Sequence, residues 1–180
     1  MSSDLNNVSY VTLVLIGEGG ASPHDLVDMN RRGGEIYYSV APSRLYAEPK
    51  RLQELGYVAA ERRPGKTRER TFYTLTDKGR EALRRWLLEP PSMPRIQNEA
   101  VAKLLAGDIL GDDEQLAATL LTLREQIEVQ QAKLERARPR IDELPHRRPY
   151  LLLVHELGNR LLQVQREWLD DVERELRKRT

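Results

Sequence analysis

The side chains best suited to chemistry in this chain lie between positions 43 and 70, and most of them are cationic. Ser43, Tyr46 and Lys50 fall on one side of a helical repeat. Hydroxyl, aromatic and cationic groups are of the kinds that reach base edges and phosphates in the major groove of DNA, which is about 12 Å wide. A second set of cations follows, made of Arg62, Arg63, Lys66, Arg68 and Arg70. Residues 61–70 contain only two acids, Glu61 and Glu69. These residues predict a surface that binds nucleic acid.

A helix and a strand hairpin must position these groups. The helix is predicted near residues 43–55, because its other side carries three leucines at helical spacing: Leu45, Leu52 and Leu55. Gly56 can then take the left-handed conformation that closes a helix. An extended run opens at Tyr57, Pro64-Gly65 marks a turn, and the β-branched and aromatic residues 71–76 predict the returning strand.

Further helices are predicted on both sides of this segment. Residues 76–89 follow the hairpin with an N-cap at Thr76 and an inward side of three residues: Leu83, Trp86 and Leu87. Upstream, the apolar run 9–16 predicts a buried helix, although its periodicity also fits a short buried strand. Ser22, Pro23 and Asp25 resemble a capping box with proline at the first helical position. This order of elements is typical of a winged helix-turn-helix.

The run SRLYAEPKRLQELGYV, followed by YTLTDKGREAL, resembles the PadR family of bacterial transcriptional regulators over about the first 90 residues. The resemblance implies that Leu45, Tyr46, Lys50, Arg51, Leu52 and Gly56 belong to the recognition helix. It also implies that the wing lies around residues 64–70. The chain departs from the commoner family pattern, because Ala47 follows the tyrosine and the proline comes later, at Pro49. A proline inside a helix removes one main-chain hydrogen bond, so both a bent helix and a late helix start are open.

Composition predicts a cytoplasmic protein of one or two small domains. The 180 residues include no cysteine, which excludes disulfides, and no apolar run approaches the length of a membrane span. The first seven residues carry no basic or apolar leader. Residues 31–88 hold 14 Lys and Arg against 7 Asp and Glu, whereas residues 1–30 hold four acids and neither Lys nor Arg. Positive charge is therefore concentrated in the segment predicted to contact phosphates.

A proline-rich segment, residues 90–95, separates the predicted DNA-binding domain, residues 1–89, from a helical domain, residues 96–180. The helical domain should begin with a short helix over 96–105. One long helix from Asp112 or Asp113 then has a heptad seam typical of a coiled coil, made of Leu116, Leu120, Leu123, Ile127, Leu134, Ala137 and Ile141. After a proline-broken turn, residues 150–177 continue with Leu153, Leu157, Leu161, Val164, Trp168, Val172 and Leu176. The two long helices should form an antiparallel hairpin.

One such hairpin has a narrow core and leaves apolar surface exposed to water. We therefore expect a homodimer held mainly by residues 96–178, and the PadR resemblance implies the same arrangement. The alternative is an intramolecular three-helix bundle. The fold class predicted for the whole chain is mainly α with a small β-hairpin wing, in which a winged helix-turn-helix precedes a coiled-coil-like dimerisation domain.

An enzyme is not expected, because the sequence offers no catalytic constellation. His24, His146 and His155 fall in different predicted elements, and no cysteine nucleophile exists. We expect neither a metal nor a cofactor. The PadR resemblance implies a response to phenolic acids or other aromatic compounds, for which Trp86 and Trp168 are candidate stacking surfaces. Tryptophans on the apolar side of a helix also serve as plain packing.

These observations predict a dimeric DNA-binding transcriptional regulator, most simply a repressor reading a pseudo-palindromic operator. Tyr46 and Lys50 are the expected groove contacts, with Ser43 on the same side. Arg44 and Arg51 are expected to contact phosphates on the flanks, and the five cations of the hairpin should follow the DNA backbone. The alternative is a protein-interaction adaptor that uses the winged helix and the helical hairpin as docking surfaces.

Overall fold

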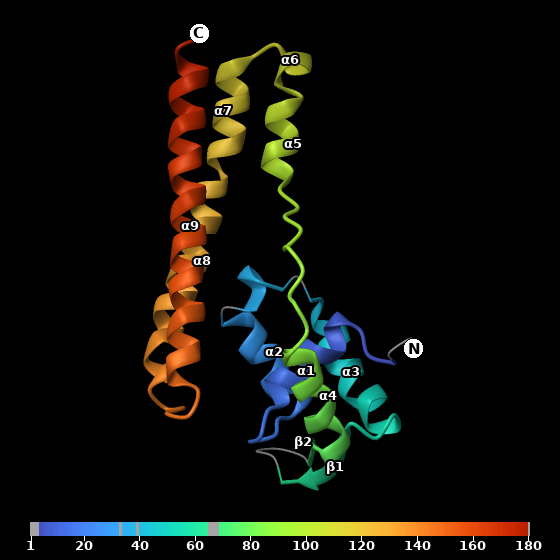
Figure 1. Cartoon of the computed structure of the whole chain (residues 1–180). Coiled ribbons are helices and arrows are strands. Elements are labelled where there is room, and N and C mark those ends of the chain that lie inside the picture. The colour runs from blue at the N-terminus through green and yellow to red at the C-terminus, as the bar shows by residue number, and fades with distance from the viewer. Residues whose placement is uncertain (1–3, 33, 39, 65–68, 180) are drawn as a thin grey trace. The chain divides into compact units, whose positions relative to one another are not determined.

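The computed structural model describes residues 4–32, 34–38, 40–64 and 69–179. It divides into two compact units, the N-terminal unit Met1–Ser92 and the helical unit Met93–Thr180 (Figure 1). Lys66 and Arg68, two of the cations expected to contact DNA, lie outside the described residues. No helix in the described ranges is both long and apolar enough to cross a membrane.

The N-terminal unit contains helices around one antiparallel strand hairpin. Its elements are α1 Asn7–Ile16, α2 Pro23–Arg31, the 3-10 turn η1 Gly34–Ile36, α3 Pro42–Glu54, β1 Val58–Arg63, β2 Arg70–Leu75 and α4 Asp77–Leu87. The apolar run after Ser9 is therefore a helix rather than a strand. The predicted capping box of α2 is confirmed, because Ser22 and Asp25 bond reciprocally and Pro23 opens the helix. These local signals fix where each helix begins.

Helix α3 runs without interruption from Pro42 to Glu54 and includes Pro49. A late helix start is therefore excluded. Pro49 has no amide to donate to the carbonyl of Leu45, so one bond of the helix ladder is missing. The Pro49 ring is fully buried, as are Leu45 and Leu52. Burial of this apolar side against the core compensates for the missing bond.

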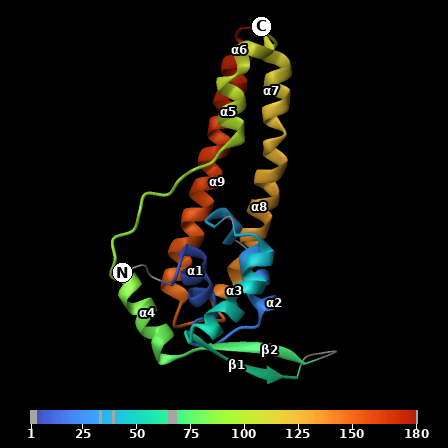
Figure 2. The same cartoon turned by 90° about the vertical axis from the view of Figure 1, so that its right-hand side faces the viewer.

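The hairpin pairs Val58 with Leu75 at its base and Arg63 with Arg70 near its tip. Figure 2 shows it extending away from the helices of the same unit. Tyr73 also exchanges two main-chain hydrogen bonds of 2.9 Å with Ala21, so the turn before α2 is tied to β2. The second strand ends at Leu75, one residue earlier than predicted. Thr76 instead caps α4, since its hydroxyl accepts from the Gly79 amide at 3.1 Å.

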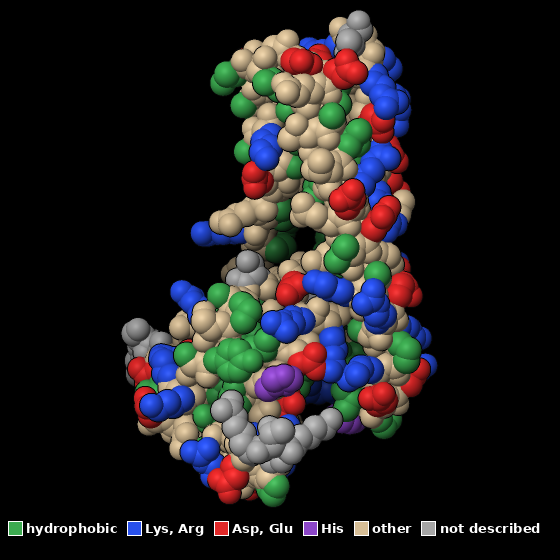
Figure 3. All heavy atoms as spheres, turned by 180° about the vertical axis from the view of Figure 1, so that it is seen from behind, with side chains coloured by type: hydrophobic (Ala, Val, Ile, Leu, Met, Phe, Trp, Pro, Cys, Tyr) green, Lys and Arg blue, Asp and Glu red, His purple; other side chains and the backbone are tan. Residues whose placement is uncertain are grey.

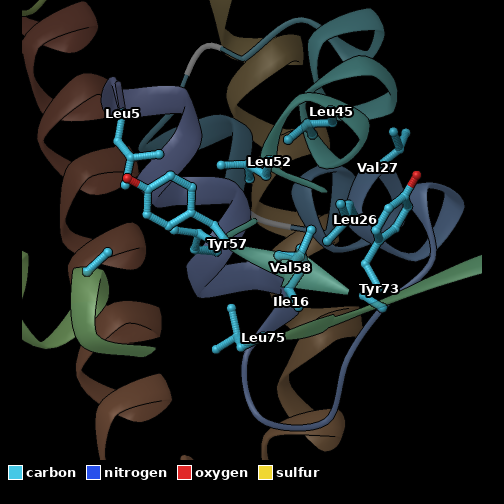
Figure 4. Close-up of a cluster of buried hydrophobic side chains, with 13 residues drawn as sticks. Leu5, Ile16, Leu26, Val27, Leu45, Leu52, Tyr57, Val58, Tyr73 and Leu75 are labelled. Atoms are coloured by element: carbon cyan, nitrogen blue, oxygen red, sulfur yellow. The ribbon is translucent and has the colours of Figure 1, made fainter. Parts of the chain in front are cut away.

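The core of the N-terminal unit draws on every one of its helices and both strands (Figure 4). Leu13, Leu26 and Leu45 are completely buried there, and Tyr57 and Tyr73 close its edges. The prediction for α4 was partly wrong. Ala82 and Leu83 face inward. Leu87 is 69% exposed, because it is the last residue of the helix and lies beyond the core.

The helical unit has more elements than predicted. It contains α5 Glu99–Leu105, α6 Gly107–Leu110, α7 Asp113–Leu121, α8 Leu123–Ala137, the 3-10 turn η2 Arg138–Ile141 and α9 Arg148–Arg177. Helix α5 begins later than predicted because Asn98 caps it, accepting from Ala100 at 3.0 Å. The expected long helix is divided at Thr122. Thr119 and Thr122 donate their hydroxyls to carbonyls of the preceding turn, a pattern that bends helices.

Helices α8 and α9 form the expected antiparallel hairpin (Figure 1). The seam predicted for α7 and α8 is largely buried, including Leu116, Leu120, Ile127 and Leu134. The seam predicted for α9 was wrong in its first half. The residues of α9 that pack inside the unit are Gly158, Leu162, Leu169, Val172 and Leu176.

The first half of the predicted α9 seam, Leu153, Leu157, Leu161 and Val164, faces outward instead, and Tyr150 one turn earlier is exposed as well. We call these five residues the α9 stripe. Leu153 is 72% exposed and Val164 is 61% exposed. Figure 3 shows hydrophobic side chains at the surface of the helical unit beside charged ones. Helix α9 therefore has two apolar sides, and only one of them is covered within the described chain.

Candidate nucleic-acid interface

The exposed side of α3 carries the residues predicted to contact DNA. Ser43, Arg44 and Lys50 are exposed, and Tyr46 is 50% exposed. Within the described ranges, neither Arg44 nor Lys50 has an ion-pair partner. The opposite side of the same helix is buried in the core, so the orientation of these side chains is set by packing. A polar, cationic helix face is thereby offered to a ligand in solution.

Arg51 differs from the other cations of α3. Its guanidinium donates to the Glu48 carboxylate at 2.8 Å and to the Ser9 hydroxyl at 3.3 Å, and it also bonds to the main-chain carbonyl of Asp4. Arg51 is thus directed toward α1. Its expected role as a phosphate contact remains a prediction.

The C-terminal end of α3 is held by Thr76, which the sequence predicted only as a helix cap, and by Lys78, for which no role was predicted. Lys78 donates to the Leu55 carbonyl at 2.7 Å, and its ammonium lies 4.3 Å from the centre of the Tyr57 ring. The Thr76 hydroxyl donates to the Gly56 carbonyl at 2.8 Å. Carbonyls at a helix end lack partners within the helix, so a cation and a hydroxyl stabilise them. The signal was present in the sequence, because Thr76 and Lys78 open the helix that follows the wing.

The described cations of the hairpin are exposed or partly exposed, and two of them have partners in the same chain. The Arg63 guanidinium lies 3.5 Å from the centre of the Phe72 ring and pairs with Glu61. Arg70 lies 3.7 Å from the Asp25 carboxylate. Exposed pairs of this kind contribute only about 0 to 1 kcal/mol. They therefore leave both arginines able to exchange a carboxylate for a phosphate.

Asp25 couples the wing to the start of α2. Burial raises the pKa of Asp25, but the hydrogen bonds from Ser22 and the charges of Arg70 and His24 lower it by more. The pKa of Asp25 therefore lies below its ordinary value. The Ser22 hydroxyl donates to the carboxylate at 2.7 Å and the Ser22 amide donates at 2.9 Å. The ionised carboxylate is thus part of the local fold.

The two tryptophans have different surroundings. Trp86 stacks on Tyr10 within the N-terminal unit, with ring centres 4.9 Å apart and planes inclined by 7°. Trp168 lines an open depression of about 520 Å³ in the helical unit, together with Leu104, Val172 and Leu176. In the described part of the chain, no group of three or more His, Cys, Asp or Glu could hold a metal ion.

Residues 28–85 match the family model described as the transcriptional regulator PadR-like family. The chain carries a PadR-like domain. The match begins within α2 and ends within α4, so the PadR-like domain includes α3 and the hairpin. All ten residues predicted to contact DNA lie inside it. The family is one of transcriptional regulators rather than of enzymes.

Relatives and solved structures agree with this assignment. Over 129 residues the chain is 28% identical to the negative transcriptional regulator PadR of Bacillus subtilis (strain 168). This match covers 71% of this chain and 69% of that protein. The PadR-like regulator BC1756 from Bacillus cereus superposes with a TM-score of 0.76 at 17% identity, covering 97% of this chain and 100% of that one.

Two further structures are complexes of Bacillus subtilis PadR. The complex with operator DNA has a TM-score of 0.67 at 24% identity, covering 96% of this chain and 99% of that one. The complex with p-coumaric acid has a TM-score of 0.57 at 24% identity, covering 92% and 98%. These likenesses confirm the predicted fold class, a winged-helix PadR-like domain followed by a helical part.

Proposed function

We propose that this chain is a dimeric DNA-binding transcriptional regulator that reads DNA with the exposed side of α3. The observation that carries the proposal is the division of α3 into two sides within a PadR-like domain. Leu45 and Leu52 are fully buried, whereas Tyr46 and Lys50 are exposed and no acid in the described part of the chain pairs with the lysine. A helix packed in this way presents fixed side chains to the major groove.

The exposed residues of α3 and the cations of the wing have separate proposed roles. Tyr46 and Lys50 contact base edges, with Ser43 beside them, and Arg44 contacts a flanking phosphate. The wing supplies backbone contacts through Arg62, Arg63, Lys66, Arg68 and Arg70. The net charge of +7 between residues 31 and 88 supports this assignment, because phosphate contacts provide most of the affinity for DNA. The operator complex of a relative with the same fold supports it as well.

A homodimer is the proposed assembly, and the α9 stripe is the main support for it. Its members recur at steps of three and four residues, which is the spacing of a coiled-coil seam. Exposed apolar surface of this kind is covered most simply by a second copy related by two-fold symmetry. Two copies would set two α3 helices about 34 to 36 Å apart, one turn of DNA.

Repression is the proposed direction of control, because the relative from Bacillus subtilis is a negative regulator. We further propose that a small aromatic compound relieves it, supported by the p-coumaric acid complex of that relative. Trp86 and Trp168 are the candidate contacts. Titrating wild type, Trp86→Phe and Trp168→Phe with phenolic acids while recording tryptophan emission would test this. Unchanged emission in all three proteins would contradict it.

The DNA-binding proposal is tested by titration of labelled DNA at several salt concentrations. A fragment selected in vitro for tight binding is compared with random DNA of equal length. Wild type should bind the selected fragment more tightly and lose roughly 10³ to 10⁵ in affinity between 50 and 200 mM salt, as expected for about six to ten phosphate contacts.

Two variants separate the proposed roles. Lys50→Ala should weaken binding to the selected fragment more than to random DNA, because it removes a base contact. Arg62→Ala should weaken both equally and lower the salt slope by about one. Equal behaviour of the two variants would contradict the division of roles. Binding that is absent or insensitive to salt would instead favour a docking module without DNA.

A further inference from the structure

A partly buried polar cluster joins the first helix of the chain to α3, with Ser9 at its buried end and Arg51 at its more exposed end. We call it the Ser9 clasp, and it consists of Ser9, Glu48 and Arg51. Ser9 is 0% exposed and donates its hydroxyl to the Glu48 carboxylate at 2.6 Å. The Glu48 side chain is only 12% exposed, and it also accepts from Arg51 at 2.8 Å. The Glu48 carboxylate of α3 therefore binds a donor from its own helix and the Ser9 hydroxyl of α1, which lies 39 residues away in sequence.

The clasp is connected to the cap of α1. The Asn6 amide donates to the Ser9 hydroxyl at 3.1 Å, and the Ser9 amide donates to the Asn6 side-chain oxygen at 3.1 Å. Arg51 adds a bond to the Asp4 carbonyl just before this cap. The hydroxyl of Ser9 thus belongs to both the capping box of α1 and the anchor of α3. Displacing α3 would disturb both.

The clasp also lies where α3 is weakest. Glu48 and Arg51 flank Pro49, the residue whose missing amide interrupts the ladder of main-chain bonds. Hydrogen bonds to charged groups are stronger than those between neutral groups. The clasp therefore fixes this turn against α1 where the helix cannot fix itself. Lys50, the proposed base contact, projects from the same turn.

We propose that Arg51 is a positioning residue, which orients α3 through Glu48 and Ser9 rather than by touching a phosphate. This inference rests on the proposed function, since orientation is detected through DNA binding. The Arg51 guanidinium donates three hydrogen bonds within the unit, to Glu48, Ser9 and the Asp4 carbonyl, whereas Arg44 on the same helix has no acid partner within the described ranges. Two arginines of one helix are thus assigned opposite tasks.

The test compares Arg51→Met with the matched control Arg44→Met, using the full-length protein and the two DNA fragments described above. Methionine keeps an apolar stem but cannot donate. Arg44→Met should weaken both DNAs equally and lower the salt slope by about one, as the loss of one phosphate contact requires. Arg51→Met should leave the slope on random DNA unchanged and weaken the selected fragment by about tenfold, the loss expected for misplaced base contacts.

Ser9→Ala provides a second, independent variant. Ser9 is completely buried and cannot reach DNA, so a selective loss on the selected fragment would have to act through α3. The melting temperature of each variant is measured alongside. If Arg51→Met fails to fold, Ser9→Ala decides the question.

Three outcomes would overturn the inference. A lower salt slope for Arg51→Met would make Arg51 a phosphate contact. Equal weakening on both DNAs with a lower melting temperature would make the clasp purely structural, and unchanged binding in both clasp variants would remove its role. If wild type itself shows no salt-dependent preference and Arg44→Met has no effect, the proposed function fails instead.

Discussion

The two units of the chain bury their apolar side chains to different degrees. In the N-terminal unit, every helix and strand contributes to one closed core, which includes Leu13, Leu26 and Leu45 at 0% exposure. In the helical unit, large apolar residues remain at the surface on α5, α6 and α9, and the α9 stripe is the longest such set. The N-terminal unit therefore has a closed core of its own. The helical unit leaves the α9 stripe exposed, and this is the surface that a second copy is proposed to cover.

The largest expected effect comes from breaking the α9 stripe. Leu153→Glu combined with Leu157→Glu places two carboxylates where the proposed second copy would pack. Because charges buried in an apolar interface are strongly unfavourable, we expect the mass measured by light scattering to fall from dimer to monomer. Affinity for the selected DNA should then fall by about 10²- to 10⁴-fold, since bivalent binding is lost.

Gln163→Glu is the matched control, because it adds a carboxylate at an exposed position of the same helix, where the Gln163 side chain donates to Glu167 at 2.8 Å. It should leave the mass and the affinity close to those of wild type. If the double variant stays dimeric, other surfaces must hold the two copies together. The exposed apolar side chains of the α9 stripe would then not explain the assembly.

Cavity-forming substitutions sharpen the comparison by asking how each unit unfolds. Leu13→Ala and Leu169→Ala each remove a completely buried side chain, one from each unit, and such changes cost about 2 to 5 kcal/mol. The loss of unfolding free energy in Leu13→Ala should be independent of protein concentration. The loss of unfolding free energy in Leu169→Ala should depend on protein concentration, because the helical unit is proposed to fold together with its partner. Calorimetry over a hundredfold concentration range checks both, and the same concentration dependence in both variants would contradict the contrast.

The sequence predicted the N-terminal unit better than the helical unit, and the reason is physical. Elements with one apolar side have a single way to face a core, so α3, the hairpin and the cap of α2 could be read from spacing and turn residues. Helix α9 has two apolar sides, with leucines at 151–153 and 161–162. The spacing of the apolar residues indicates that both sides of α9 are apolar, but it does not indicate which side packs inside the chain. The predicted seam was therefore half right.

The candidate site was predictable in its exposed residues and not in its supports. Tyr46 and Lys50 lie opposite the buried leucines, which spacing alone determines. The partners of Arg51 were not predictable, because Ser9 lies 42 residues away and fits a buried helix without any polar role. A contact between such distant residues depends on how α1 and α3 pack, and packing has no signature in one sequence. The only clue was Glu48, an acid beside the buried side of a cationic helix.

Close packing around Gly79 should produce the next largest effect. A Cβ at this position would lie 2.1 Å from the Tyr57 carbonyl oxygen, which is main chain and cannot move aside. We expect Gly79→Ala to destabilise the N-terminal unit by about 1 to 3 kcal/mol. Gly19→Ala is the control, since nothing lies within 4 Å of its added Cβ. Urea denaturation should show a loss for Gly79→Ala alone, and equal stability of the two variants would mean that the base of the hairpin is loosely packed.

The smallest expected effect concerns acid stability, which should differ between Asp25→Asn and wild type. The folded pKa of Asp25 lies below its unfolded value of about 3.9, so the ionised carboxylate stabilises the fold above pH 4. That stabilisation is lost as the pH falls through the folded pKa. Asp25→Asn should therefore be less stable than wild type at pH 7, and the two should converge as the pH falls below the folded pKa of Asp25. Melting temperatures measured across this range test the sign. A difference that grows on acidification would mean that Ser22 and Arg70 do not favour the charged form, and that the start of α2 is held to the wing by packing alone.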